Sequence, residues 1–458
     1  MPSNCTDNGK LMKKKIIVII TWLTLQSVLG TVTAQTGMDQ TAAQIADKMG
    51  IGWNLGNTLE AGNNANNFTN KGGLGAETSW QDTKTTQAIV DYVKSLGFGN
   101  IRIPCAWVMG HISNPTTYEI DQAWMKRVKE VVDYCIKAGL YTVINQHWDG
   151  GWLENHIKDT GSVTLKKNKD ILNAIWTQIA TEFRDYDEHL LFAGLNEPNF
   201  DENGNTAQQI ANLVEYEQTF IDAVRATGGN NEKRVLIIQG PSTNIDHTCK
   251  FLTLDKLPKD PTPDKLMLEV HYYSPWQFWG MEKDESWGKV FYYWGEGNHQ
   301  PGSQHNATWG EESYMREELQ MMKTHFADKG YPVYIGEFGA NWRTITGNNE
   351  SQAKHDASIK QHYRMLCQTA LEMGIVPVMW DTNYRSRPSM TIVNRKDRNI
   401  FNQLMMDGIL DAVTAGISTP STLLQNVSSR AYTLQGTAVD PTQLTHGLYI
   451  MNGHKYLK

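Results

Sequence analysis

The sequence predicts a (β/α)8 TIM barrel followed by a short C-terminal tail of β character. From about residue 49 to 383, short apolar runs alternate with amphipathic helical patterns, as repeated βα units on a parallel sheet do. Eight such runs can be counted, the number that closes a barrel. No G-x-G-x-x-G motif follows the first run, which disfavours an open sheet that binds a dinucleotide.

The eight strands are predicted where an apolar run stops at a polar residue or a turn. In chain order they are expected at Met49–Asn57, Asn100–Pro104, Tyr141–His147, Leu190–Glu197, Arg234–Gly240, Lys265–Tyr273, Pro332–Phe338 and Ile375–Asp381. Between them, the segment Asp121–Ala138 repeats apolar residues at three- and four-residue steps and stops at Gly139, which is typical of a helix packed on a sheet. A last helix is expected near Asn399–Ala415.

The first segment is predicted to be a signal peptide, residues 1–34, rather than part of the fold. Three lysines precede an apolar run from Ile16 to Leu29, and Val32 and Ala34 are the small residues that a signal peptidase reads. Met12 directly precedes the lysines, so residues 1–11 are an alternative upstream extension. The run is shorter than the roughly 20 residues of a membrane span. We therefore expect a secreted or cell-surface protein without a membrane span after cleavage.

The catalytic domain is predicted over residues 35–415, a linker over 416–430 and a sorting-type tail over 431–458. After the last helix the composition shifts to Ser, Thr, Pro and Gln, and Pro420 breaks the helical pattern. The final 28 residues alternate as one or two strand hairpins would, but they are too few to form a core of their own.

The charge and the cysteines limit the classes of partner. The chain has 42 Lys and Arg against 49 Asp and Glu, and an acidic protein repels nucleic acid and anionic membranes. Cys105, Cys135, Cys249 and Cys367 are scattered without the spacing of a metal site, and one disulfide among them is left open. We expect a neutral ligand, no cofactor and a monomer.

Two carboxylates stand where the fourth and seventh predicted strands end. Glu197 lies in Gly194-Leu195-Asn196-Glu197-Pro198, and Glu337 lies in Ile335-Gly336-Glu337-Phe338-Gly339. Active sites of these barrels form at the C-terminal ends of the strands, and paired carboxylates that flank a bond are what glycoside hydrolysis requires. Either Glu alone would more simply be a helix cap or a loop charge; together they indicate a catalytic pair.

Other polar residues are expected at the same rim. Arg102 on the second strand places a cation there, which favours the ionised form of a nearby carboxylate, although a purely structural salt bridge is the alternative. His147 ends the third strand, and His271 and Tyr273 share one side of the sixth. The histidines lack the spacing of metal ligands, so we predict no metal site and assign them to hydrogen bonding.

Aromatic residues offer flat surfaces to sugar rings. Trp380 ends the eighth strand, and a long loop after the sixth strand contains Trp276, Trp279 and Trp294 among its tryptophans. Long loops in compact domains are usually lids or binding surfaces. Packing beneath the loop is the alternative for each tryptophan.

The residues resemble glycoside hydrolase family 5, the cellulase-type retaining β-glycanases of clan A, over roughly residues 38 to 415. The resemblance rests on an ordered set of motifs: Gly52–Glu60, Glu77–Trp80, Ile101–Pro104, Asn145–His147, Leu195–Pro198, His271–Tyr273, Ile335–Gly339 and Trp380. It implies an exported bacterial endo-β-1,4-glucanase that acts by double displacement on β-1,4-linked polysaccharide or oligosaccharide.

The resemblance also implies a role for each matching residue. Glu197 is expected to be the acid/base, Glu337 the nucleophile and Asn196 a donor to the sugar 2-hydroxyl. Arg102 and Tyr273 would hold the nucleophile. The cleavage subsite would be shaped by His147, His271 and Trp380. Apart from these carried-over roles, Asn57 and Trp148 are further candidate substrate contacts.

Two departures from the family pattern leave the preferred polysaccharide open. Trp148 stands where many relatives carry a second His, and the eighth strand continues as Trp380-Asp381-Thr382-Asn383-Tyr384 rather than W-D-N-G. Xyloglucanase, mixed-linkage β-glucanase and β-mannanase are alternatives within the same fold. A non-catalytic carbohydrate-binding barrel is the alternative of another class, but binding alone needs no carboxylate pair. The C-terminal stretch resembles the sorting tails of the type IX export route.

Overall fold

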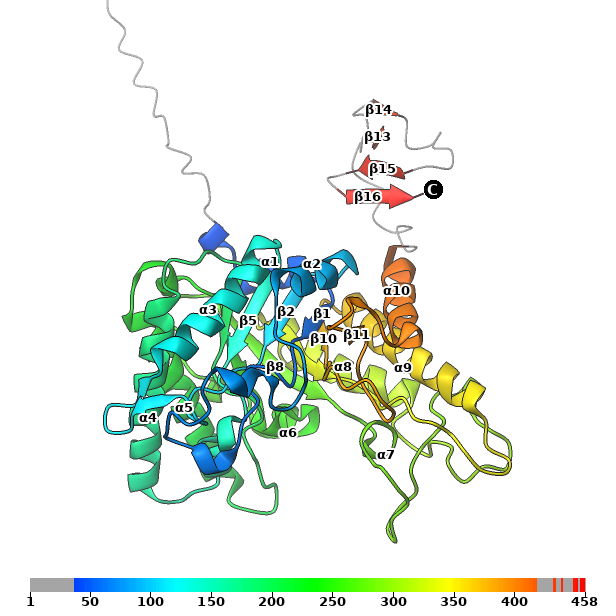
Figure 1. The fold of residues 1–458 in the computed structure, drawn as a ribbon, viewed down its shortest axis with the longest axis horizontal. Coiled ribbons are helices and arrows are strands. Elements are labelled where there is room, and N and C mark those ends of the chain that lie inside the picture. Colours follow the sequence, from blue (N-terminus) through cyan, green and yellow to red (C-terminus); the bar gives the residue numbers. More distant parts are fainter. Residues whose placement is uncertain (1–36, 418–430, 434–437, 440–447, 452–453, 458) are drawn as a thin grey trace, which may run out of the picture. The chain divides into compact units, whose positions relative to one another are not determined.

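A computed structural model describes residues 37–417, 431–433, 438–439, 448–451 and 454–457 (Figure 1). Its centre is a closed barrel of eight parallel strands in the spatial order β1-β10-β9-β8-β7-β6-β5-β2. These strands are β1 (Gly52–Asn54), β2 (Asn100–Ile103), β5 (Tyr141–Asn145), β6 (Leu190–Ala193), β7 (Leu236–Gln239), β8 (Leu266–Tyr272), β9 (Val333–Phe338) and β10 (Val376–Met379). The predicted (β/α)8 barrel is confirmed, and each strand lies inside the range predicted for it.

The barrel is surrounded by helices (Figure 1), most of which follow a barrel strand and cover its outside; the first precedes β1, and the seventh is one turn in the loop after β8. They are α1 (Ala42–Met49), α2 (Gln87–Ser95), α3 (Gln122–Lys137), α4 (Ser162–Glu182), α5 (Thr206–Ala226), α6 (Ile245–Phe251), α7 (Trp276–Trp279), α8 (Glu312–His325), α9 (Gln352–Glu372) and α10 (Gln403–Ile417). The predicted helix Asp121–Ala138 is α3, whose cap residue Asp121 accepts hydrogen bonds from the amides of Ala123 and Trp124, as a helix N-cap should.

The last helix begins later than predicted. Asn399 and Ile400 form β12 (Asn399–Ile400), which pairs with β11 (Val393–Asn394) in a small antiparallel sheet, and α10 begins only at Gln403. A second small pair joins β3 (Ile112–Asn114) to β4 (Glu119–Ile120). Both pairs belong to loops at the active-site end of the barrel.

The N-terminal end of the barrel is closed by apolar side chains. Helix α1 inserts Ile45 and Met49 into a cluster with inward-facing strand residues such as Val143, Leu191 and Ile237. All of them are buried. Polar side chains that face into the barrel therefore concentrate at the opposite, C-terminal end of the strands.

Strand β9 contains one extra residue, a β-bulge. Val270 pairs with Ile335, but the next residue, His271, pairs with Glu337, so that Gly336 is skipped. Side chains alternate between the two faces of a strand, and Ile335 packs in the helix-facing core. Without the bulge Glu337 would point the same way as Ile335. The extra residue instead turns Glu337 toward the barrel mouth, a common use of bulges near active sites.

The predicted β character of the tail is confirmed. Strands β13 (Ala431–Thr433), β14 (Ala438–Val439), β15 (Leu448–Met451) and β16 (His454–Leu457) form an antiparallel sheet in the order β14-β13-β15-β16. Of the predicted linker, residues 416 and 417 belong to α10, and 418–430 lie outside the described residues, as does the predicted signal peptide.

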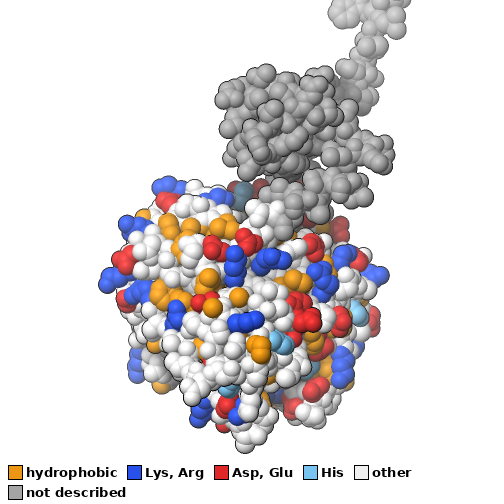
Figure 2. Space-filling view, turned by 90° about the vertical axis from the view of Figure 1, so that its right-hand side faces the viewer, with side chains coloured by type: hydrophobic (Ala, Val, Ile, Leu, Met, Phe, Trp, Pro, Cys, Tyr) orange, Lys and Arg blue, Asp and Glu red, His pale blue; other side chains and the backbone are white. Residues whose placement is uncertain are grey.

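Among the described residues, no helix combines the length and apolar character that crossing a bilayer requires. Cys105, Cys135, Cys249 and Cys367 are free thiols. On the face shown in Figure 2, acidic and basic side chains are interspersed, with apolar side chains among them.

Candidate active site

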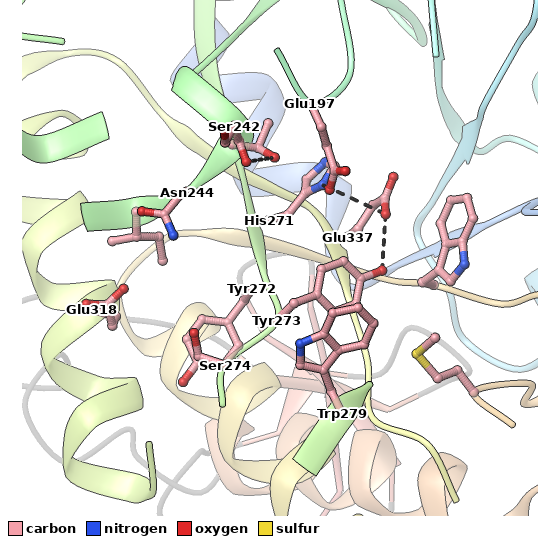
Figure 3. Close-up of a pocket in the computed structure, with 14 residues that line it drawn as sticks. Glu197, Ser242, Asn244, His271, Tyr272, Tyr273, Ser274, Trp279, Glu318 and Glu337 are labelled. Atoms are coloured by element: carbon pink, nitrogen blue, oxygen red, sulfur yellow. Dashed lines mark hydrogen bonds and ion pairs between the residues drawn. The ribbon is translucent and has the colours of Figure 1, made fainter. Parts of the chain in front are cut away.

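The two predicted carboxylates meet at the C-terminal mouth of the barrel (Figure 3). One oxygen of Glu197, one of Glu337 and one ring nitrogen of His271 all lie within 4.8 Å of one another. The environments differ, because the Glu337 side chain is 8% exposed and that of Glu197 is 45% exposed. One carboxylate is therefore fixed in the barrel wall, while the other reaches solvent.

Glu337 is held from two sides. The guanidinium of Arg102 donates to its Oε1 at 2.9 Å, and the hydroxyl of Tyr273 donates to its Oε2 at 3.1 Å. Burial raises the pKa of Glu337, whereas the positive charges of His271 and Arg102 oppose that rise. The two hydrogen bonds fix the orientation of the carboxylate.

Arg102 connects Glu337 to the rest of the rim. Its guanidinium also donates to Oδ1 of Asn54 at 3.0 Å and to Oδ1 of Asn196 at 2.7 Å. Asn54 in turn donates to the carbonyl of Gly336 at 2.8 Å, which ties the bulge to the neighbouring strand. The two interpretations of Arg102 therefore coincide: it is a buried structural cation that contacts the candidate nucleophile.

Glu197 is anchored through His271 and through its own backbone. Nδ1 of His271 lies 2.7 Å from Oε1 of Glu197, and the Glu197 amide donates to Oε1 of Glu154 at 2.6 Å. Glu154 is fully buried; burial, followed by the nearby charge of Glu197, raises its pKa to about 8. Glu154 is therefore protonated at neutral pH.

The two histidines of the site differ in charge. Burial would lower the pKa of His271, but the surrounding Glu337, Glu197 and Glu269 outweigh it and raise that pKa to about 10. Burial, with Arg102 and His271 next, lowers the pKa of His147 well below its ordinary value. His147 is neutral, and its ring stacks on Trp380 at 5.7 Å between centroids.

A cavity of about 420 Å³ opens beside the carboxylates. Its lining comprises Glu197, Ser242, Thr243, Asn244, Ile245, His271, Tyr272, Tyr273, Ser274, Trp279, Glu318, Glu337, Trp380 and Met390. Trp279 packs on Tyr273 with ring centroids 4.4 Å apart, and Figure 3 shows it at the end of the cavity away from Glu197. This cavity is the candidate active-site cleft.

The remaining predicted substrate contacts separate into three groups. Trp276 is 46% exposed and meets Trp279 edge to face, but it does not line the cleft. Trp148 and Asn57 are partly buried and also lie outside the lining. Trp294 is fully buried, and its indole donates to the carbonyl of Gly310 at 2.7 Å. The prediction that Trp294 contacts substrate is wrong, because it packs beneath the loop.

Sequence reasoning missed three residues of the site. Glu269 lies two residues before His271 and therefore on the same side of β8, a signal that was present in the sequence. Asn54 ends β1, as the other rim residues end their strands. Glu154 lies in a short turn, Glu154–His156, 43 residues before the amide that it contacts, and no local pattern marks it.

The cluster of Glu197, His271 and Glu337 has the donor types of a metal site. In the metal-free protein the surrounding carboxylates raise the pKa of His271 to about 10, and a protonated imidazole offers no lone pair to a metal. The same three groups can carry out proton transfer and charge stabilisation.

Comparison with known proteins agrees with this chemistry. The family model Cellulase (glycosyl hydrolase family 5) matches residues 61–386. Endoglucanase A of Paenibacillus barcinonensis is 34% identical over 390 residues, with 81% of this chain and 90% of the relative covered. A xyloglucan-specific endo-β-1,4-glucanase of Bacteroides ovatus is 36% identical, with 77% and 67% covered.

A solved structure is still more similar in sequence. A xyloglucan-specific β-1,4-glucanase from a ruminal metagenomic library, in complex with XXLG, is 45% identical, with a TM-score of 0.74 and with 82% of this chain and 97% of that chain covered. The chain therefore belongs to glycosyl hydrolase family 5, the cellulase family, and is a glycoside hydrolase of the endo-1,4-β-glucanase type.

Proposed function

We propose that the protein cleaves internal bonds of β-1,4-glucan chains with retention of anomeric configuration, using Glu337 as nucleophile and Glu197 as acid/base. The observation that carries the proposal is the spacing of the two carboxylates, whose nearer oxygens lie within 4.8 Å. Retaining glycosidases have carboxyl groups about 5–5.5 Å apart, whereas inverting enzymes need about 6.5–9.5 Å to admit a water.

In the first step Glu337 attacks the anomeric carbon, the bond to the leaving sugar oxygen breaks, and Glu197 gives that oxygen its proton. As Glu197 becomes a carboxylate, the cationic His271 donates to its Oε1 and stabilises the new charge. In the second step Glu197 takes a proton from water, and the resulting hydroxide displaces Glu337. The oxygen of Asn196 is engaged by Arg102, so its amide nitrogen is the group that would donate to the sugar 2-hydroxyl.

Endo action is supported by binding surface beyond the carboxylates. A second cavity of about 460 Å³ is lined by loop residues that include Trp80 and Tyr384, which are 47% and 56% exposed. Exposed aromatic faces among polar groups suit sugar rings. The loop carrying Tyr384 follows Trp380, which lines the first cavity, and we propose that a chain of several sugars contacts both cavities.

Xyloglucan is the second candidate substrate. The 45% identity to a xyloglucan-specific enzyme exceeds the 34% identity to Endoglucanase A, which favours tolerance of a branched glucan. Reducing-sugar release should be measured in parallel on carboxymethylcellulose, barley glucan, xyloglucan and glucomannan. We expect activity on the first three; activity on glucomannan alone would overturn the glucanase assignment.

The roles of the two carboxylates are separable by substitution. Glu337→Gln should abolish turnover on every substrate, whereas Glu197→Gln should retain more activity on aryl glycosides whose leaving group needs no proton. Glu188→Gln, before β6 at the opposite end of the barrel, serves as the control. Equal losses for Glu197→Gln on both kinds of substrate would contradict its role, and an inverted anomer in NMR of the first product would contradict retention.

We also propose that the chain is exported, with cleavage after Ala34. The sequence features of residues 13–34 support this, and a polymeric substrate must be met outside the cell. The mature protein should begin at Gln35 by N-terminal sequencing; an intact N-terminus on the active enzyme would contradict the proposed cleavage.

A further inference from the structure

A third carboxylate, Glu269, lies beneath the two catalytic ones and is fully buried. Its Oε1 is 3.1 Å from Nε of Arg102 and 3.3 Å from Nε2 of His271. The contact with Arg102 is an ion pair whose geometry is not that of a hydrogen bond. Its Oε2 accepts from the side-chain amide of Gln239 at 2.6 Å. Glu269 thus touches both cations of the site.

Each of these cations also contacts one catalytic carboxylate. Arg102 donates to Glu337, and His271 contacts Glu197. Glu337 also lies within ion-pair distance of both cations, 2.9 Å from Arg102 and 3.8 Å from His271. Glu269 therefore joins the anchor of the nucleophile to the anchor of the acid/base from beneath, outside the reacting pair.

The barrel leaves room for this carboxylate. Gly336, the skipped residue of the β9 bulge, faces Glu269, and a Cβ built on it would lie 1.8 Å from Oε1 of Glu269. Any larger residue would displace the carboxylate or the strand. Glu269 can therefore occupy this place because residue 336 is a glycine.

Glu269 is ionised, in contrast to its neighbour Glu217. Burial alone would raise the pKa of Glu269, but Arg102 and His271 reverse the effect and lower it. Glu217 on α5 is equally enclosed and accepts from the amide of Gln239 at 2.7 Å, but no cation of the described residues faces it, and burial raises its pKa well above the ordinary value. Glu269 therefore carries a charge in the barrel interior, and Glu217 does not.

We infer that Glu269 is a positioning residue: its buried carboxylate holds Arg102 and His271 in place and supplies the negative charge that keeps His271 cationic between the two catalytic carboxylates. The inference rests on the proposed roles of Glu197 and Glu337. It adds that a buried carboxylate outside the reacting pair also stabilises the positive charge of His271.

Several charged or titratable groups surround His271 and bear on its protonation. They are Glu269 on its own strand, Tyr273 directly after that strand, Glu337 on β9, Glu197 after β6, His147 after β5, and Glu154. Arg102 on β2 and Tyr334 on β9 interact with Glu269 and Glu337. Arg102 and His147 do not favour a second cation, so the three glutamates paired with the His271 ring must supply the stabilisation; they are Glu197, Glu269 and Glu337. Glu269 is the one of the three that takes no part in bond making or breaking.

Replacing Glu269 with Gln removes the charge and keeps the size. The amide oxygen of the new side chain can accept from Gln239 or face the two cations, but not both, so at least one polar group loses its partner. Loss of an adjacent charge typically moves a pKa by about 1 to 3 units. His271 should therefore deprotonate at a pH lower by about that amount, and kcat should fall about 10- to 100-fold, the cost of a misplaced catalytic group.

The experiment is a pH titration of the His271 ring by NMR of isotope-labelled histidine, with the signal assigned by its loss in His271→Gln. In the wild type the ring should stay protonated above pH 8, and in Glu269→Gln it should titrate about 1 to 3 units lower. Glu217→Gln is the matched control, since it changes a buried glutamate that also contacts Gln239 but removes no charge. It should leave the His271 titration unchanged.

The outcomes distinguish this inference from the proposed function. An unchanged His271 titration and pH–kcat profile in folded Glu269→Gln would overturn the positioning role, while loss of activity in Glu337→Gln would still support the mechanism. If Glu269→Gln does not fold, the wild type decides: a His271 ring that titrates near its ordinary pKa refutes the inference. Partial recovery of kcat in Glu269→Asp would support it, since the charge is restored at a shorter reach.

Discussion

Two tryptophans of one loop should respond in opposite ways to substitution by alanine. Trp294 is fully buried, packs against His362 with ring centroids 5.0 Å apart, and donates to the carbonyl of Gly310. Trp279 is partly exposed and lines the cleft. The first substitution removes part of the core, and the second removes part of a binding surface.

The expected magnitudes follow from these environments. Removing a buried Trp costs about 3–5 kcal/mol, and the carbonyl left without its donor adds about 1 kcal/mol or more, so Trp294→Ala should lower the Tm by about 5–10 °C. Loss of an aromatic contact of about 0.5–1.5 kcal/mol should raise KM in Trp279→Ala by roughly two- to twelvefold.

The assay combines thermal unfolding by circular dichroism with kcat and KM on cello-oligosaccharides. Trp287→Ala is the control, because Trp287 lies in the same loop, is 64% exposed and lines neither cavity described above; it should change neither Tm nor KM. The reasoning is refuted if Trp294→Ala unfolds at the wild-type temperature, or if Trp279→Ala loses stability while KM stays the same.

Three further predictions concern pH, metals and the tail. His271 has a folded-state pKa raised from 6.5 to about 10, and Glu154 one raised from 4.5 to about 8. A raised pKa favours the folded state below the ordinary value of the group, and this contribution is lost as the pH rises through the folded-state value. Tm should therefore fall as the pH rises to about 8 through Glu154 and His271 and further to about 10 through His271, and the fall should be less steep in His271→Gln. Exhaustive EDTA treatment should leave activity on soluble glucan unchanged; loss that zinc or calcium restores would contradict the metal-free mechanism. Deletion of residues 420–458 removes no residue of the described site, so the truncated enzyme should keep its kcat, and a folded but inactive product would show that the tail contributes to the cleft.

The barrel was predictable because its strands are buried on both faces and read as short apolar runs. The polar residues at the C-terminal rim of the barrel were predictable for the same reason, since Glu197, Arg102 and His147 stand where such runs stop. The orientation of Glu337 was not deducible from alternation, because a period of two assigns it to the same face as Ile335, and only the pairing with β8 reveals the extra residue.

The sequence also could not show which tryptophans of the long loop after β8 are buried. Trp279 and Trp294 occur in equally aromatic surroundings, and their difference depends on which side of the loop meets α9, a tertiary contact. The position of Glu269, by contrast, could be deduced from the sequence. It lies two residues before His271 and therefore faces the barrel interior as His271 does.

The bulge in β9 has a consequence for transplanting this chemistry. A designer who copies Glu197 and Glu337 onto another eight-stranded barrel, with strands of regular pairing, would send the proposed nucleophile into the helical layer. The extra residue, the glycine that faces position 269 and the asparagine that binds its carbonyl have to be carried over with the carboxylate as one unit. An insertion or deletion in β9 between the bulge and Glu337 would turn this carboxylate away from the barrel mouth.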